Sequence, residues 1–188
     1  SLLPSVRVVE SDALLVDWDE LLASSDRWRL VANLPYNVGA SIVLDVLQRA
    51  SRVQSLLVMV QREVGERLAT PPGGRGSGIP SVVVAVHASA RVVGSVPASV
   101  FLPQPHVESV LVELRRHAAP VVGADPAALI ALARQAFGQR RKMLRRSLDG
   151  IVDDAIFARA GVAAEARPES LDLDAWDRLT DAVAAGSR

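Results

Sequence analysis

Residues 6–69 alternate between short apolar runs typical of buried strands and segments whose apolar residues fall at helical spacing. Parallel strands require such an alternation, because each must be joined to its parallel neighbour by a crossover that usually contains a helix. The chain is therefore expected to be an α/β protein with a parallel sheet. The predicted strands are residues 6–9, 28–32 and 53–60, and the predicted helices are residues 17–22, 38–50 and 62–69.

The pattern is less regular after residue 69. Residues 70–80, TPPGGRGSGIP, are predicted to be a flexible loop, and the Gly-x-Gly-x-Gly pattern inside it follows a helix, which is the wrong context for a cofactor-binding turn. By β propensity alone residues 81–86 would be a strand. Residues 91–97 and 107–116 are predicted as two late strands, separated by the proline-rich FLPQPH, a long excursion for a simple hairpin.

From residue 117 the sequence resembles a small helical domain. HAAPVVGADP is a linker, and Asp125-Pro126 supplies an N-cap and a first-turn proline for a helix with an apolar stripe. Further helices are expected near residues 151–160 and from residue 172, where Trp176 belongs to a second stripe. We predict two domains, residues 1–117 and residues 118–188. The first stripe consists of Leu129, Leu132, Ala133, Ala136 and Phe137.

Composition limits the possible functions. The 188 residues are 49% hydrophobic, which is enough for a buried core. Lys+Arg and Asp+Glu both number 21, so any affinity for nucleic acid must come from a local patch. The absence of cysteine excludes disulfides, zinc-thiolate sites and thiol nucleophiles. No secretory signal or apolar stretch of membrane length is found, and the protein is expected to be cytoplasmic.

Several polar residues give weaker signals. His87, His106 and His117 lack the spacing of metal ligands, and no metal site is predicted. Arg62 and Glu63 come just after a predicted strand and could shape a site, but a solvated ion pair is the simpler interpretation.

Asn33-Leu34-Pro35-Tyr36 lies where a predicted strand ends and a helix begins, the position at which open α/β sheets bind ligands. An adenine N6 amine is a poor nucleophile, because its lone pair is delocalised into the ring. The Asn33 side-chain oxygen and the Leu34 carbonyl could each accept one N6 hydrogen, Pro35 would stiffen the turn, and Tyr36 would stack on an extruded base. A strand-end turn with a half-buried tyrosine is the structural alternative.

Four segments together resemble the KsgA-like ribosomal RNA adenine dimethyltransferases in order and spacing, over nearly the whole chain. The resemblance implies the C-terminal portion of a Rossmann-like class I methyltransferase sheet, with late antiparallel strands, followed by a small all-α domain. It also implies a helix, not a strand, over residues 81–86. The four segments are NLPYN from Asn33, VMVQREV from Val58, FLPQPHVES from Phe101 and AFGQRRKMLR from Ala136.

The resemblance implies a reaction and roles for residues. Family enzymes use S-adenosylmethionine to dimethylate N6 of two adjacent adenosines near the 3′ end of small-subunit (16S) ribosomal RNA, during ribosome biogenesis. By this likeness Asn33 to Tyr36 form the target-base motif and Phe101 packs on or near the other face of the base. Asp12, in ESDAL, and Asn33 contact the methyl donor. The protein is expected to act as a monomer on the small ribosomal subunit, without a metal or a membrane.

Part of the family pattern is absent from the 188 residues. Relatives begin with a Gly-rich strand-to-helix turn and an acidic strand end that hold the donor, and neither is found here. We therefore expect that the chain lacks the N-terminal donor-binding part and is inactive alone. The alternatives are a large-subunit enzyme of the macrolide-resistance type, which generally lacks the QRRK segment, and a non-catalytic RNA-binding or ribosome-assembly module.

A basic segment follows the first C-terminal stripe. If residues 137–148 form one continuous helix, Phe137, Leu144 and Leu148 lie on an apolar face. The Arg and Lys side chains of the segment then lie beside that face or opposite it. A solvated surface is one interpretation, and contact with RNA phosphates is the other. The predicted RNA-binding residues are Arg140, Arg141, Lys142, Arg145 and Arg146.

Overall fold

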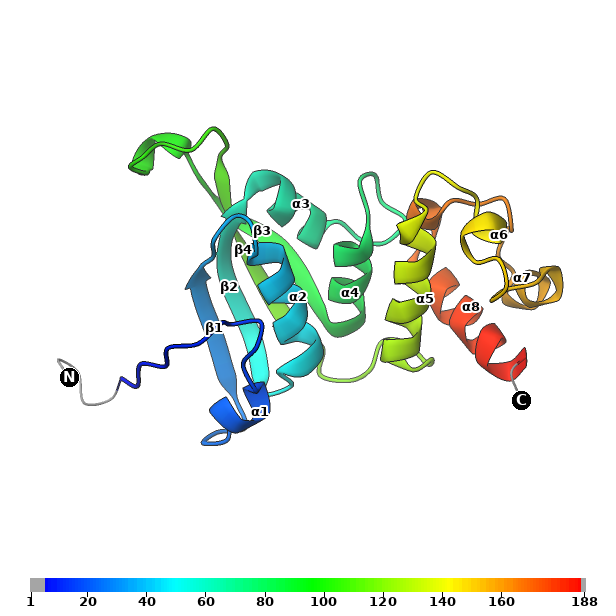
Figure 1. The fold of residues 1–188 in the computed structure, drawn as a ribbon, viewed down its shortest axis with the longest axis horizontal. Coiled ribbons are helices and arrows are strands. Elements are labelled where there is room, and N and C mark those ends of the chain that lie inside the picture. The colour runs from blue at the N-terminus through cyan, green and yellow to red at the C-terminus, as the bar shows by residue number, and fades with distance from the viewer. Residues whose placement is uncertain (1–5, 187–188) are drawn as a thin grey trace.

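The structure is a computed structural model that describes residues 6–186, so the outermost residues of both predicted domains, 1–5 and 187–188, lie outside the described part. Its central feature is a mixed sheet (Figure 1). The described strands are β1 (Trp28–Asn33), β2 (Val53–Gln61), β3 (Ala88–Val96) and β4 (Ser109–Arg116), in the order β1-β2-β4-β3. β1 and β2 are parallel, whereas β4 runs antiparallel to both β2 and β3. Two of the three strands predicted before residue 69, as a parallel pair, and the two late antiparallel strands are therefore confirmed.

Helices cover one face of the sheet. α2 (Gly39–Arg49), α3 (Arg62–Ala69) and α4 (Ile79–His87) lie beside the strands in Figure 1, and α1 (Trp18–Leu21) lies at the lower end of β1. Alternate side chains of β2 and β4 point into this layer, so that Val58 and Val112 are fully buried. On the opposite face Val31 is 76% exposed. Glu113 lies on that open face, where hydrogen bonds from Arg115 and Arg91 lower the pKa of its carboxyl.

One predicted strand is wrong. Residues 6–10 belong to no described strand, and Val8 is 88% exposed. β-branched residues favour strands because they pack on a pleated, half-buried surface. Within residues 6–186 no strand pairs with this segment, so its β-branched side chains have no sheet on which to pack.

α4 corrects the expectation from β propensity over residues 81–86. The segment is helical, as the family resemblance implied, because both sides of the helix are buried. Val82, Val83 and Val86 pack into a core formed with the C-terminal helices, and Val84 packs into the core beneath the sheet. A helix between two cores needs apolar residues on all sides, and β-branched residues meet that need despite their lower helix propensity.

The C-terminal residues form three predicted helices, α5 (Pro126–Gly138), α7 (Asp154–Ala160) and α8 (Leu173–Gly186), and a short separate helix, α6 (Leu144–Ser147). Two short 3₁₀ turns, η1 (Ala98–Val100) and η2 (Pro168–Ser170), complete the assignment for the described residues. The side chain of Asp125 accepts a hydrogen bond from the amide of Ala128, which confirms the predicted N-cap. Trp176 is fully buried, and its ring centroid lies 6.1 Å from that of Phe137.

The prediction of one continuous helix over residues 137–148 is wrong. α5 ends at Gly138, residues 139–143 form a turn, and α6 begins at Leu144. The amide of Leu144 donates to the carbonyl of Ala166, and the amide of Arg145 donates to that of Ala164. Because these amides bond to a distant segment, they do not continue the helical ladder from α5. The helical projection of the cations therefore does not hold, although Leu144 and Leu148 are fully buried.

Candidate active site

The first wall of the candidate site is the turn that follows β1. β1 ends at Asn33 and β2 at Gln61, so the carboxyl ends of two parallel strands meet at this edge of the sheet. The amide of Leu34 donates to the carbonyl of Met59 over 3.2 Å, and the carbonyl of Pro35 accepts from the amide of Gly39 over 2.8 Å. These two bonds fix the path of the chain from the strand into α2.

The second wall is the excursion between β3 and β4, residues 97–108, which we call the arm. It projects beyond the end of the sheet (Figure 1). The two walls line an open pocket of about 250 Å³. One pocket is thus lined by the sequence-predicted residues Asn33 to Tyr36 and Phe101. The arm comes after β2 and β3 in the sequence, so the fold brings distant segments together. The lining residues are Asn33, Leu34, Pro35, Tyr36, Phe101, Pro103 and Pro105.

A hydrogen bond links the turn after β1 to Ser109, the residue that directly follows the arm. The Tyr36 hydroxyl lies 2.7 Å from Oγ of Ser109, the first residue of β4. Ser109 is fully buried, so its hydroxyl needs a partner inside the protein, and Tyr36 supplies it. Sequence reasoning assigned no role to Ser109. The available signal was a serine directly before the apolar run of a late strand, and such a serine has many explanations.

Arg62 holds the base of the arm. Its amide donates to the carbonyl of Glu108 over 2.9 Å, and its guanidinium contacts the Glu108 carboxylate at 2.7 Å and donates to Oγ of Ser95 at 2.8 Å. Ser95 lies on β3 and Glu108 directly precedes β4, so one arginine binds both ends of the arm. The simpler interpretation, an ion pair between Arg62 and Glu63, is wrong: Arg62 pairs with Glu108 and Glu66, and Glu63 pairs with Arg67.

Asp12 does not line this pocket. It lies in the exposed segment before α1, where its Oδ1 accepts the amide of Leu14 at 2.9 Å in a local turn. The structure therefore brings Asn33, Tyr36 and Phe101 together and leaves Asp12 apart from them. Its second carboxylate oxygen is free of any hydrogen bond recorded for residues 6–186.

The basic cluster, as we call Arg140, Arg141, Lys142, Arg145 and Arg146, surrounds the turn between α5 and α6, and all five residues are exposed. Arg140 donates weakly to the carbonyl of Ser77 at 3.4 Å, and Arg145 pairs with Glu165 at 3.2 Å. For Arg141, Lys142 and Arg146, no ion pair is recorded with any described residue. Ser77 is itself buried and donates to the carbonyl of Glu169, so the loop containing it packs against the helical part.

Among the described residues, no group of three or more histidine, aspartate or glutamate side chains is placed to hold a metal ion. Among the helices of residues 6–186, none has both the length and the apolar character needed to cross a membrane.

Comparison with known proteins identifies the family. A family model described as ribosomal RNA adenine dimethylase matches residues 2–184. The chain is 48% identical over 158 residues to ribosomal RNA small subunit methyltransferase A of Acidothermus cellulolyticus. It is 39% identical over 176 residues to the protein of that name from Pseudomonas fluorescens. The chain belongs to the ribosomal RNA adenine dimethylase family.

The chain is shorter than these relatives. The alignment covers 81% of the chain but 54% of the Acidothermus protein, and 93% of the chain but 65% of the Pseudomonas protein. The chain thus spans about half to two thirds of the length of the curated relatives that it matches.

Two solved structures support the Rossmann-like methyltransferase fold expected from the sequence. A dimethyladenosine transferase from Plasmodium falciparum superimposes with a TM-score of 0.68 at 18% identity, covering 80% of the dimethylase chain and 64% of that structure. The 23S rRNA methyltransferase ErmE superimposes with a TM-score of 0.66 at 20% identity, covering 96% of the chain and 73% of that structure. The fold class is therefore confirmed.

Proposed function

We propose that the protein takes part in the N6-dimethylation of two adjacent adenosines near the 3′ end of small-subunit ribosomal RNA, with S-adenosylmethionine as methyl donor. The observation that carries this proposal is the convergence of the Asn33–Tyr36 turn and the arm on one pocket. The family and the printed names of the relatives point to the same reaction. The proposed partner is the small ribosomal subunit in the cytoplasm, on which the protein acts as a monomer.

The chain's own residues account for recognition of the adenine. Oδ1 of Asn33 and the carbonyl of Leu34 accept the two N6 hydrogens, which draws the amine towards the tetrahedral geometry of a nucleophile. Pro35 fixes φ in the turn, so both acceptors keep their direction. Tyr36 stacks on one face of the extruded base and Phe101 packs on the other face. The carbonyl of Pro35, which bonds to Gly39, maintains the turn during the reaction.

The donor would be contacted from the same strand end. S-adenosylmethionine supplies an electrophilic methyl group on a sulfonium when it is bound. Asn33, exposed at the end of β1, fits a place beside that methyl group, and Asp12 offers a free carboxylate oxygen for the donor's adenine. The Gly-rich turn and the acidic strand end that hold the donor in relatives are not found in these 188 residues, so only Asp12 and Asn33 remain of the expected donor contacts. We therefore propose that the 188-residue chain alone binds the donor weakly and shows no turnover.

The basic cluster is proposed to hold the RNA. Its cations would bind phosphates without reading sequence, while the pocket selects the adenine. Three of these cations have no recorded ion pair among the described residues, which leaves them available to phosphate oxygens.

One assay separates the candidate functions. The protein that contains this chain is incubated with donor and with small subunits that lack the methyl groups, and the nucleosides are analysed by mass spectrometry. Dimethyladenosine in small-subunit RNA is the expected product. Dimethyladenosine found instead in large-subunit RNA would support the macrolide-resistance type, and binding without any methyladenosine would support an assembly module.

A further inference from the structure

The pocket contains a tyrosine whose hydroxyl is held by Ser109, the residue that directly follows the arm. Tyr36 is half-buried, and its ring lines the pocket while its hydroxyl reaches Oγ of Ser109 at 2.7 Å. Ser109 does not line the pocket and is fully buried. Any effect of its hydroxyl on the pocket must therefore pass through the Tyr36 ring.

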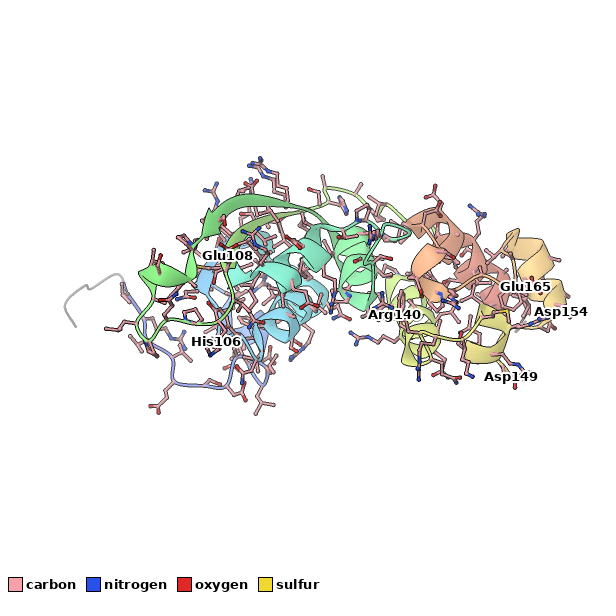
Figure 2. All side chains as sticks on the ribbon, turned by 90° about the horizontal axis from the view of Figure 1, so that it is seen from above. His106, Glu108, Arg140, Asp149, Asp154 and Glu165 are labelled. Atoms are coloured by element: carbon pink, nitrogen blue, oxygen red, sulfur yellow. The ribbon has the colours of Figure 1, made fainter. Side chains whose placement is uncertain are left out.

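Ser109 is itself held in place from both sides. In the sheet it pairs with Gln61 of β2 and with Val96 of β3. The preceding residue, Glu108, accepts the Arg62 amide at its carbonyl and the Arg62 guanidinium at its carboxylate. Figure 2 shows Glu108 with His106 on the arm. The point to which the Tyr36 hydroxyl bonds is thus the same point at which the arm joins the sheet.

We propose that Ser109 is a positioning residue for the base pocket. Its hydroxyl fixes the outer end of the Tyr36 ring relative to the arm that carries Phe101, so the ring is held where it can stack on a flat base before the base arrives. A ring held in advance loses less conformational freedom on binding than a mobile ring. The inference rests on the proposed function, in which Tyr36 stacks on the adenine.

The first test needs no RNA. Tyr36 is the only tyrosine in the sequence, so ¹³C-labelled tyrosine gives one set of ring signals in the NMR spectrum of the 188-residue chain. We expect Ser109→Ala to increase the mobility of this ring, measured by ¹³C relaxation. Ser99→Ala, which removes an exposed hydroxyl from the same arm, should leave it unchanged. Unchanged ring mobility in a folded Ser109→Ala protein would overturn the proposal.

A second variant removes the same hydrogen bond if Ser109→Ala does not fold. Tyr36→Phe keeps the ring and deletes the hydroxyl on the pocket side. With ¹³C-labelled phenylalanine, the ring at position 36 appears as one signal added to those of the three natural phenylalanines. The proposal requires this ring to be more mobile than Tyr36 in the wild-type chain. Equal mobility would contradict it.

The consequence for the base is measured with a small-subunit RNA hairpin that carries 2-aminopurine next to the target adenosine, so the target keeps its N6 amine and its extrusion into the pocket unstacks the probe. We expect Ser109→Ala and Tyr36→Phe each to weaken binding of the hairpin, followed by this fluorescence change, by about 3- to 10-fold, the value of one hydrogen bond. The double variant should be no worse than either single variant, and additive losses would show that Ser109 acts independently of Tyr36. If the wild-type protein gives no fluorescence change, the proposed function fails, whereas the ring mobility still decides the role of Ser109.

Discussion

Asn33 stands at the carboxyl end of β1 with its side chain exposed to the pocket. In the proposed reaction its side-chain oxygen accepts a hydrogen bond from the amine while positive charge develops on the nitrogen. Asn33→Ala should therefore lower turnover by about 10²-fold, as the removal of one donor or acceptor aimed at a developing charge does in other enzymes. The measurement is methyl transfer to undermethylated small subunits by the protein that contains this chain.

The control for Asn33 is a nearby asparagine. Asn37 is also exposed but does not line the pocket, so Asn37→Ala should keep near wild-type turnover. Equal losses in the two variants would show that the turn is merely sensitive to substitution, and an active Asn33→Ala protein would remove Asn33 from the mechanism.

His87, at the end of α4, makes stability depend on pH. Burial, together with the charges of Arg116 and His117, lowers the pKa of His87 below 6.5, and its Nε2 has no hydrogen-bond partner among the described residues. The unfolded chain therefore takes up a proton before the folded chain does. The contribution of neutral His87 to the free energy of unfolding is fully present above the unfolded-state pKa of about 6.5. It is lost as the pH decreases from there through the folded-state pKa.

Urea unfolding at neutral and mildly acidic pH measures this effect. The loss of unfolding free energy on acidification should be smaller in His87→Leu than in the wild-type protein. His106→Gln, which changes an exposed histidine on the arm, should show the wild-type loss. A wild-type pH dependence in His87→Leu would assign the effect to other groups.

Sequence reasoning predicted those site residues that belong to short, distinctive segments. Asn33 to Tyr36 and Phe101 do share a pocket. The role of Ser109 could not be predicted, because it depends on the register that pairs Ser109 with Gln61 across two strands. The partner of Arg62 was missed for the same reason, since Glu108 comes within reach only after the antiparallel strands have formed. Strand register depends on tertiary packing and is not encoded locally.

At the scale of elements, α4 decides how the chain divides. We propose to keep the boundary between residues 117 and 118, but the core of the helical unit also contains residues from before that boundary. Val82, Val83 and Val86 of α4 are buried among the C-terminal helices. Each such side chain contributes about 1.5–3 kcal/mol when fully buried, and a small domain has only a few kcal/mol of net stability.

A fragment of residues 118–188 is therefore expected not to fold by itself. Its near-ultraviolet circular dichroism should be weak, and its unfolding by urea should lack a cooperative transition, because the site normally filled by α4 is empty. The 188-residue chain, measured in parallel, should unfold cooperatively. A sharp transition in the fragment would mean that the helical unit is independent of α4.

The three wrong predictions of secondary structure from local sequence have a common cause. Residues 81–86 have the composition of a strand, yet the chain places them between two cores, where a helix buries every side. Residues 6–9 also have that composition, but no described strand pairs with them. Residues 137–148 have helical spacing, but amides of α6 bond to Ala164 and Ala166 instead. In each case a tertiary partner overrode the local preference.

At the scale of the whole molecule, the pocket and the basic cluster lie in different parts of an elongated protein. Figure 2 shows His106 and Glu108 on the arm and Arg140 towards the helical end, beside which Asp149, Asp154 and Glu165 lie. An RNA that fills the pocket and also contacts the cluster must therefore extend along the molecule. The acidic residues would confine the proposed phosphate-binding surface to the turn between α5 and α6, because Asp149 and Asp154 share a pocket with Arg145 and Arg146, and Glu165 pairs with Arg145.

Replacing Lys142, Arg145 and Arg146 together by Gln should weaken binding to small subunits. The slope of log affinity against log salt concentration should decrease by up to about three units, because each lost phosphate contact no longer releases a counterion. The loss from Arg145 should be the smallest of the three, since it already pairs with Glu165. Affinity is measured over a salt series, and circular dichroism verifies the fold.

A variant with the same change of charge elsewhere serves as the control. Gln at Arg27, Arg52 and Arg159, which lie outside the basic cluster, should leave the salt slope unchanged. If the two triple variants behave alike, the interaction depends on the net charge of the protein. If neither changes the affinity, the cluster faces solvent in the complex.

The position of α4 between two cores also has a consequence for how the molecule opens. Local fluctuations expose the amides of surface helices to solvent, but the amides of α4 are covered on one side by the sheet layer and on the other by the C-terminal helices. Opening either core alone leaves the other in place. Deuterium should therefore reach Val83 and Val84 only when the whole chain unfolds, and their exchange rates would give the global free energy of unfolding directly.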